Sequence, residues 1–122
     1  MIGVGDLQGH WRRAWLRAPG FEDRLTCVYW MQAGSLYADI RIPADRPDIR
    51  GAAALSDLPP RTLRRLLEAE GFAGNITVEN EICTWARRIN WHGQTDAIDA
   101  GHLAFGPDGA LTETGIHAEY SE

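Results

Sequence analysis

The feature that most constrains this chain is a two-residue alternation of side-chain type, which recurs in short segments along most of its length. In Leu36–Ile42, for example, one set of alternate residues is apolar, whereas the other set is Tyr37, Asp39 and Arg41. Alternate side chains of a β-strand point to opposite faces, so a period of two predicts strands and not helices. Short glycine-containing turns join several segments, which is typical of antiparallel hairpins. The chain is therefore expected to be mainly β.

Seven or eight strands and one helix are expected. The predicted strands are His10–Arg17, Arg24–Ala33, Leu36–Ile42, Asn75–Glu79, Ile82–Trp91, Ala97–Phe105 and Ala110–Tyr120. The helix, Pro59–Glu70, would follow the third strand, because prolines begin it, leucines recur at helical spacing and Gly71 ends it. A single short helix is expected to pack against the sheet or to plug it.

Several predicted strands mix an aromatic side chain with a polar one on the same face. Trp30 alternates with Gln32, and Trp85 alternates with Arg87. A β-sandwich needs one clean apolar face on each strand, whereas a barrel of about eight strands can enclose polar and aromatic groups around a small ligand. The sequence therefore predicts an antiparallel β-barrel, with residues 1–122 as a single domain.

The segment Asp6–Trp11 resembles the Gly-x-Trp start of the first strand in lipocalins and the wider calycin superfamily. Four later stretches look like a narrower group of uncharacterised bacterial lipocalin-like proteins, related to a fungal protein built of two such barrels. These stretches are Trp30–Gln32, Tyr37–Pro43, Phe72–Gly74 and Asp99–Gly101. The resemblance, from Asp6 to Glu122, implies a lipocalin-like barrel in which Trp11 closes one end, packed against an arginine or another aromatic side chain. It implies no particular reaction.

Two features depart from that family pattern. A long loop with the predicted helix lies between the third and fourth predicted strands, and no helix follows the last one. The strand-like pattern at Tyr120–Glu122 is also cut short, which leaves open whether the sequence continues in a longer protein.

Charge and composition exclude several classes of function. The formal net charge of -5 argues against a dedicated nucleic-acid binder. No apolar run is long enough to cross a membrane, and no secretory signal is visible at the N-terminus, so a cytoplasmic protein is expected. The resemblance implies that the protein is bacterial. All twelve basic side chains are arginines, which excludes catalysis by a lysine Schiff base. Two cysteines, Cys27 and Cys83, are too few for a disulfide scaffold and are expected to be reduced and buried.

A small-molecule site is predicted inside the barrel, with no cofactor. The predicted ligand-binding residues are Trp30, Gln32, Asp39, Arg41, Trp85 and Arg87. Indole rings and an amide are typical ligand contacts, and Arg41 held by Asp39 offers a planar fork for a carboxylate or phosphate. The ligand would be small and apolar, aromatic or anionic. Apolarity alone would instead place the Leu36–Ile42 aliphatic residues in the core and the charged ones in solvent.

Two other functions are left open. The chain could be an enzyme that uses the cavity for acid–base chemistry, or a structural or interaction domain whose barrel is packed solid. The candidate acids and bases are Asp39, His102, Glu113 and His117. His102, His117 and Glu119 would meet only if the last two strands paired, and no metal site is predicted, because a polar barrel interior or surface is the better explanation of these residues. The identity of the ligand and the oligomeric state are not determined by the sequence.

Overall fold

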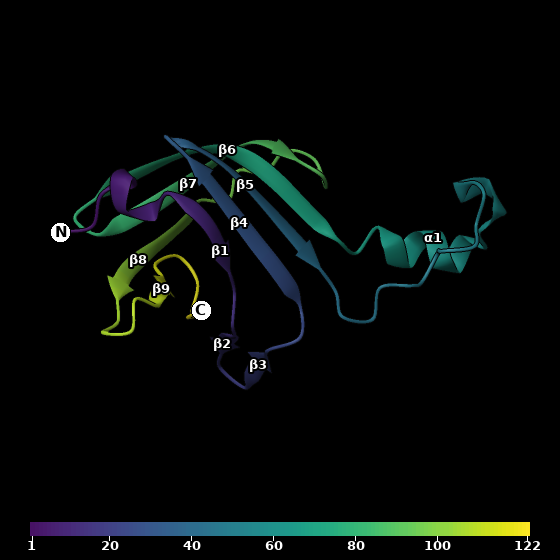
Figure 1. Cartoon of the computed structure of the whole chain (residues 1–122), viewed down its shortest axis with the longest axis horizontal. Coiled ribbons are helices and arrows are strands. Elements are labelled where there is room, and N and C mark those ends of the chain that lie inside the picture. Colours follow the sequence, from purple (N-terminus) through teal and green to yellow (C-terminus); the bar gives the residue numbers. More distant parts are fainter.

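The computed structural model describes all 122 residues, and its main element is a curled antiparallel sheet. The seven strands of this sheet lie in the order β1-β4-β5-β6-β7-β8-β9 and curve into a half-barrel, as Figure 1 shows. Their bounds are β1 Gly9–Arg12, β4 Cys27–Ala33, β5 Leu36–Ile42, β6 Glu70–Glu79, β7 Ile82–Asn90, β8 Asp99–Phe105 and β9 Leu111–Gly115. A separate hairpin of β2 (Leu16–Ala18) and β3 (Phe21–Asp23) follows β1. The prediction of a mainly β, antiparallel fold is confirmed.

The predicted first strand, His10–Arg17, is divided into β1 and β2. The chain leaves the sheet after Arg12, where the side chain of Arg13 turns toward two carboxylates: its guanidinium lies 2.9 Å from Asp23 and 3.1 Å from Glu122. Strand β3 (Phe21–Asp23) was not predicted, so the strands number nine and the helix follows the fifth strand instead of the third.

The helix α1 (Pro60–Leu66) does not pack against the sheet, so that expectation was wrong. None of its residues is buried, and in Figure 1 it extends away from the half-barrel with its connecting loops. Arg65 on α1 instead binds Asp45 in the loop that precedes it. Strand β6 then begins at Glu70, several residues before the predicted start at Asn75. No helix of the chain is long and apolar enough to cross a membrane.

The interior face of β5 is the one that carries Tyr37, Asp39 and Arg41. Tyr37 is only 4% exposed, whereas Leu36 on the opposite face is 61% exposed. In the register of the sheet Asp39 lies between Trp30 of β4 and Phe72 of β6, so this face meets the large aromatic side chains of both neighbours. An aromatic ring buries more surface than the aliphatic side chains of β5 do, which favours this orientation.

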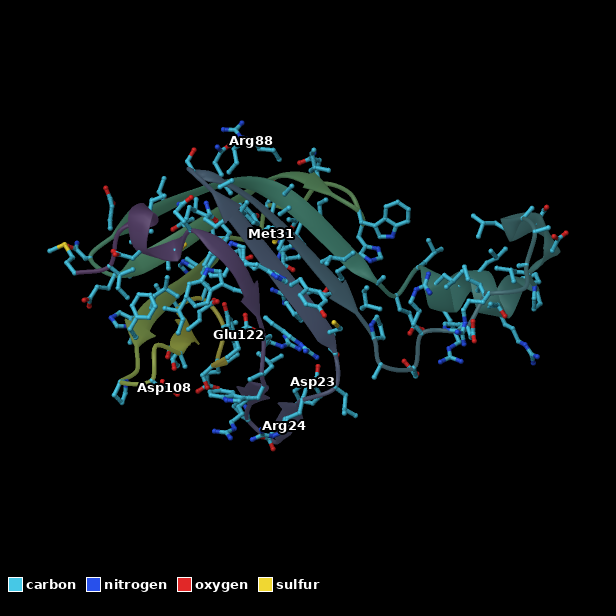
Figure 2. All side chains as sticks on the ribbon, in the orientation of Figure 1. Asp23, Arg24, Met31, Arg88, Asp108 and Glu122 are labelled. Carbon is cyan, nitrogen blue, oxygen red and sulfur yellow. The ribbon has the colours of Figure 1, made fainter.

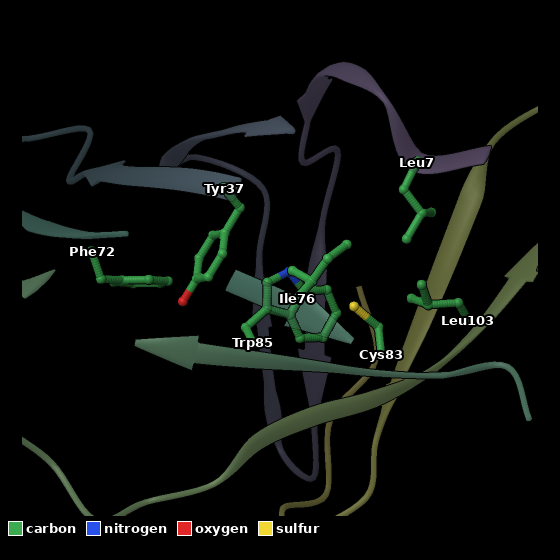
Figure 3. Packing of buried hydrophobic residues seen from close by; sticks show 7 residues of the cluster. All are labelled: Leu7, Tyr37, Phe72, Ile76, Cys83, Trp85 and Leu103. Carbon is green, nitrogen blue, oxygen red and sulfur yellow. The ribbon is translucent and has the colours of Figure 1, made fainter. Parts of the chain in front are cut away.

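The apolar core is small and lies on the concave side of the sheet (Figure 3). Its members are Leu7, Tyr37, Phe72, Ile76, Cys83, Trp85 and Leu103. Leu7 comes from a short 3-10 turn, Val4–Leu7, that precedes β1. Cys83 is a buried free thiol, as predicted, whereas Cys27 is free but only half-buried, so the expectation that it is buried was wrong.

The two edge strands of the sheet, β1 and β9, do not pair with each other. The last residues of the chain connect them indirectly. Glu113 of β9 exchanges backbone hydrogen bonds of 2.7 and 2.9 Å with Glu122, and Ser121 exchanges two of 2.8 Å with Arg17 of β2. The curled sheet is thus joined to the small hairpin along this side.

The bulge in β6 provides a stability test. At Gly74, where the pairing of β6 with β7 shifts, an added Cβ would overlap with the carbonyl oxygen of Ala86. At Gly71 on the same strand a Cβ would meet only the carbonyl oxygen of Asp39, at 4.0 Å. Gly74→Ala should therefore lower the free energy of unfolding by at least about 2 kcal/mol in urea titrations, the scale of a forced overpacking. Gly71→Ala is the matched control and should change it little.

Candidate functional site

A cavity of about 100 Å³ lies on the concave side of the half-barrel. Its walls are both aromatic and charged. The lining residues are Trp11, Arg12, Arg13, Val28, Trp30, Asp39, Arg41, Phe72, Trp85, Asp99, Leu103, Leu111, Glu113 and Glu122. In Figure 2, Glu122 lies beneath the sheet with the other concave-side groups, whereas Arg88 lies on the opposite side. Every strand of the main sheet therefore contributes residues to the lining of the cavity.

Three tryptophans form one wall of this cavity. The ring of Trp30 stacks against Trp11 with centroids 5.9 Å apart and meets Trp85 edge-on at 5.6 Å. Hydrogen bonds fix two of the indoles: Nε1 of Trp11 donates to the carbonyl oxygen of Leu7 at 2.8 Å, and Nε1 of Trp30 donates to Gln32 at 2.9 Å. Trp11 thus packs against another aromatic side chain, as the resemblance implied, whereas its closing of a barrel end stays a prediction.

Each arginine of the interior is paired with a carboxylate. Arg41 Nε lies 3.1 Å from Asp39, and Arg87 lies 3.0 Å from Asp99. The side chain of Arg13, only 7% exposed, bridges Asp23 and Glu122. A buried charge without a partner is costly, so these pairs make a charged interior possible. No guanidinium here is left without a carboxylate partner.

The surroundings of Asp23 and Asp39 shift the pKa values of these two carboxyl groups in opposite directions. Hydrogen bonds from the Thr26 side chain and from the backbone of Thr26 and Leu25 hold the pKa of Asp23 at about 2. Burial raises the pKa of Asp39, and the attraction of Arg41 opposes that shift without cancelling it.

Glu113 is the carboxyl group of the cavity that has no arginine partner. Its Oε1 accepts a short hydrogen bond from the hydroxyl of Tyr120, and its side chain lies over Gly101, where a Cβ would collide with it. Burial raises the pKa of Glu113 to about 8, and the nearby carboxylates of Glu122 and Asp99 add to the effect. Glu113 therefore carries a proton at neutral pH.

The cavity contains four of the six residues predicted to bind a ligand. Trp30, Asp39, Arg41 and Trp85 line it. Gln32 is 4% exposed and bridges Trp30 and the carbonyl oxygen of Gly34, so its role is to hold the indole. Arg87 binds Asp99 and lies over the ring of Phe72, 3.7 Å from its centroid, outside the lining.

Among the lining residues that form ion pairs, sequence reasoning missed three as site residues: Arg13, Asp99 and Glu122. A signal existed for Arg13, because it alternates with Trp11 and Trp15 in the same way as Arg87 alternates with Trp85. Asp99 and Glu122 carry no comparable pattern. Both reach the cavity through long-range pairing of strands or chain ends.

The candidate acid–base residues divide into two groups. Asp39 and Glu113 line the cavity, whereas His102 is 51% exposed and lies 3.6 Å from Glu81 on the surface. His117 follows the end of β9, in an exposed turn. The predicted strand Ala110–Tyr120 ends at Gly115, so it does not bring His117 beside His102. The chain contains no group of three or more His, Cys, Asp or Glu side chains suited to a metal ion.

No family model, curated protein or solved structure matches this chain. The lipocalin-like grouping therefore stays a prediction from the sequence.

The pKa of Glu113 predicts how stability depends on pH. Its value in the folded chain, about 8, lies above the ordinary glutamate value. Between the two values the folded state binds more protons than the unfolded state, so the free energy of unfolding falls as pH rises. In the wild type, the free energy of unfolding should fall between about pH 5 and pH 9. Glu113→Gln should make this fall smaller by roughly 2–4 kcal/mol.

Urea unfolding at several pH values measures this effect. Glu79→Gln, at an exposed position of β6, is the matched control and should leave the wild-type profile unchanged. A Glu113→Gln profile as steep as that of the wild type would contradict the buried environment assigned to Glu113.

Proposed function

We propose that this chain is a small-molecule-binding protein of lipocalin-like form, with its ligand in the cavity on the concave side of the sheet. The observation that carries the proposal is that one void joins three tryptophans to the Asp39–Arg41 ion pair. Apolar and aromatic walls with a few fixed polar groups are the usual make-up of a ligand pocket. A purely structural domain would instead be expected to fill this space with its own side chains.

The size of the cavity limits the ligand. Its volume of about 100 Å³ is smaller than that of an engineered apolar cavity of about 150 Å³ that holds benzene, and far below drug-sized pockets. Scaled by volume from benzene, the ligand, or the part of it that enters, has on the order of four heavy atoms. A larger molecule would have to extend past the rim of the cavity, where Arg12 is exposed.

The fixed groups of the site favour a ligand with an apolar body. Trp30 is held by Gln32, and Trp11 is held by the backbone at Leu7, so the indoles are ordered before any ligand arrives. A preorganised wall reduces the entropy lost on binding. The ligand would gain contact area against these rings and would meet the polar groups at one end only.

An enzyme is the second candidate, and one observation favours it. A cavity carboxyl with a pKa of about 8, that of Glu113, is able to donate a proton at neutral pH. Asp39 on β5 is the other candidate acid or base from the sequence that lines the cavity. His102 and His117 are not part of this candidate, because neither lines the cavity.

A ligand screen with cavity variants tests the binding proposal. Small amines, alcohols, carboxylates and simple aromatic compounds are screened by the shift in melting temperature and by tryptophan fluorescence. Val28→Phe places a larger side chain at a buried lining position, 5% exposed, and should abolish the response while the far-UV circular dichroism stays unchanged. Trp30→Phe should weaken binding several-fold, because it removes part of the stacking surface.

Trp91→Phe is the matched control, since Trp91 is 63% exposed and does not line the cavity. It should leave affinity unchanged. If Val28→Phe fails to fold, Leu111→Phe at another lining position replaces it. The binding proposal is refuted by a screen without hits, or by hits that bind the wild type and the filled-cavity variant equally well.

A further inference from the structure

We propose that the ligand is a small cation, an alkylammonium or quaternary ammonium compound, with its charge beside Glu113 and its alkyl groups against the tryptophans of the cavity. The inference rests on the proposed function, because it assumes that the cavity binds a ligand. It differs from the sequence-based expectation of an apolar, aromatic or anionic ligand. Three features of the site support it.

The first feature is the balance of charged groups. In and around the cavity four ionised carboxylates and the protonated carboxyl group of Glu113 face three guanidinium groups. The carboxyl groups are Asp23, Asp39, Asp99, Glu113 and Glu122, and the guanidinium groups are Arg13, Arg41 and Arg87. Arg12 reaches the rim of the cavity, but its side chain is exposed and its guanidinium lies over the ring of Tyr29, so it is not one of the buried charges. A cationic ligand would reduce the excess of negative charge, and an anionic one would increase it.

The second feature is that the arginines are already engaged. Arg41 binds Asp39, and its guanidinium also lies over the ring of Phe72, 5.2 Å from the centroid. Arg13 is shared between two carboxylates. An anion would have to compete with a buried carboxylate for either group, at the cost of leaving that carboxylate unpaired. Glu113, in contrast, has only the hydroxyl of Tyr120 as a side-chain partner.

The third feature is the aromatic wall. The ring of Phe72 already has two guanidinium groups over it, those of Arg41 and Arg87. The indoles of Trp11, Trp30 and Trp85 make no cation–π contact with an arginine. Tryptophan is nevertheless the best aromatic partner for a cation. Indole rings and a carboxyl group in one small cavity suit a compact alkylammonium head group.

The charge of Glu113 links cation binding to pH. Glu122 and Tyr120 from the C-terminal segment, Asp99 on β8 and Arg41 on β5 face this carboxyl group. A bound cation favours the ionised carboxylate, so binding below the pKa of Glu113 releases a proton. The affinity for a permanently charged cation should therefore rise as pH increases toward about 8, whereas a neutral ligand of the same shape should show no such rise.

Three compounds of matched shape test the inference. Choline is a permanent cation, 3,3-dimethyl-1-butanol is its neutral counterpart, and 3,3-dimethylbutanoate is an anion of similar size. Titration calorimetry and tryptophan fluorescence measure their affinities for the wild-type chain at several pH values. Choline should bind at least tenfold more tightly than the alcohol, and the carboxylate should bind most weakly.

The variant that separates charge from shape is Glu113→Gln. It should weaken choline binding at least fivefold at pH 8 and remove the rise of affinity with pH, while the alcohol binds as before. Glu79→Gln, at an exposed site outside the cavity, is the control and should behave as the wild type. Retention of the pH-dependent affinity for choline in Glu113→Gln would overturn the role given to Glu113.

The outcomes distinguish this inference from the proposed function. Equal binding of choline and the alcohol, or tightest binding of the carboxylate, overturns the proposal of a cationic ligand. Either result remains compatible with a ligand site in the cavity. Failure of all three compounds also overturns the proposal of a cationic ligand when only neutral or anionic compounds of the screen bind in a manner that Val28→Phe abolishes. Failure of the whole screen overturns both proposals.

Discussion

The structure depends on the pairing of charges in an interior that is too polar to be held by apolar contacts alone. Only 12 of the 122 residues are buried, so the apolar core by itself is thin. Ion pairs from Arg13, Arg41 and Arg87 occupy the space that aliphatic side chains would fill in an ordinary barrel. Such pairs add little net stability, but removal of one partner is costly, so each pair restricts how the strands can be arranged.

Arg13 shows this restriction most clearly. It contacts Asp23, ten residues away, and Glu122, 109 residues away. One side chain thereby fixes the exit of β1, the end of the β2–β3 hairpin and the C-terminal segment that pairs with β9. The same contacts bring Glu122 next to Glu113, and the mutual repulsion of these carboxyl groups contributes to the raised pKa of Glu113. The architecture and the electrostatics of the cavity thus have a common origin.

Charges on the concave side have a consequence on the convex side. Because the face with Tyr37, Asp39 and Arg41 is turned inward, the aliphatic residues that alternate with them are turned outward. Leu36 is 61% exposed, Ile40 is 45% exposed, and Met31 of the neighbouring strand is 53% exposed. This inversion explains why apolarity alone predicts the wrong orientation for β5. Aromatic area, rather than the number of apolar residues, decides which face is buried.

The sequence by itself determined the β class, the hairpin turn at Gly34–Ser35 and the alternation of tryptophan with charge that identified Trp30, Asp39, Arg41 and Trp85 as neighbours of one interior. These properties are local, because they depend on a period of two and on turn residues. Only the tertiary structure decided which face of each strand is interior, where the first strand breaks, and that the helix stands apart from the sheet. It also decided that Glu113 lacks a guanidinium partner. Those outcomes depend on strand register and on contacts between residues far apart in the chain, which no local pattern records.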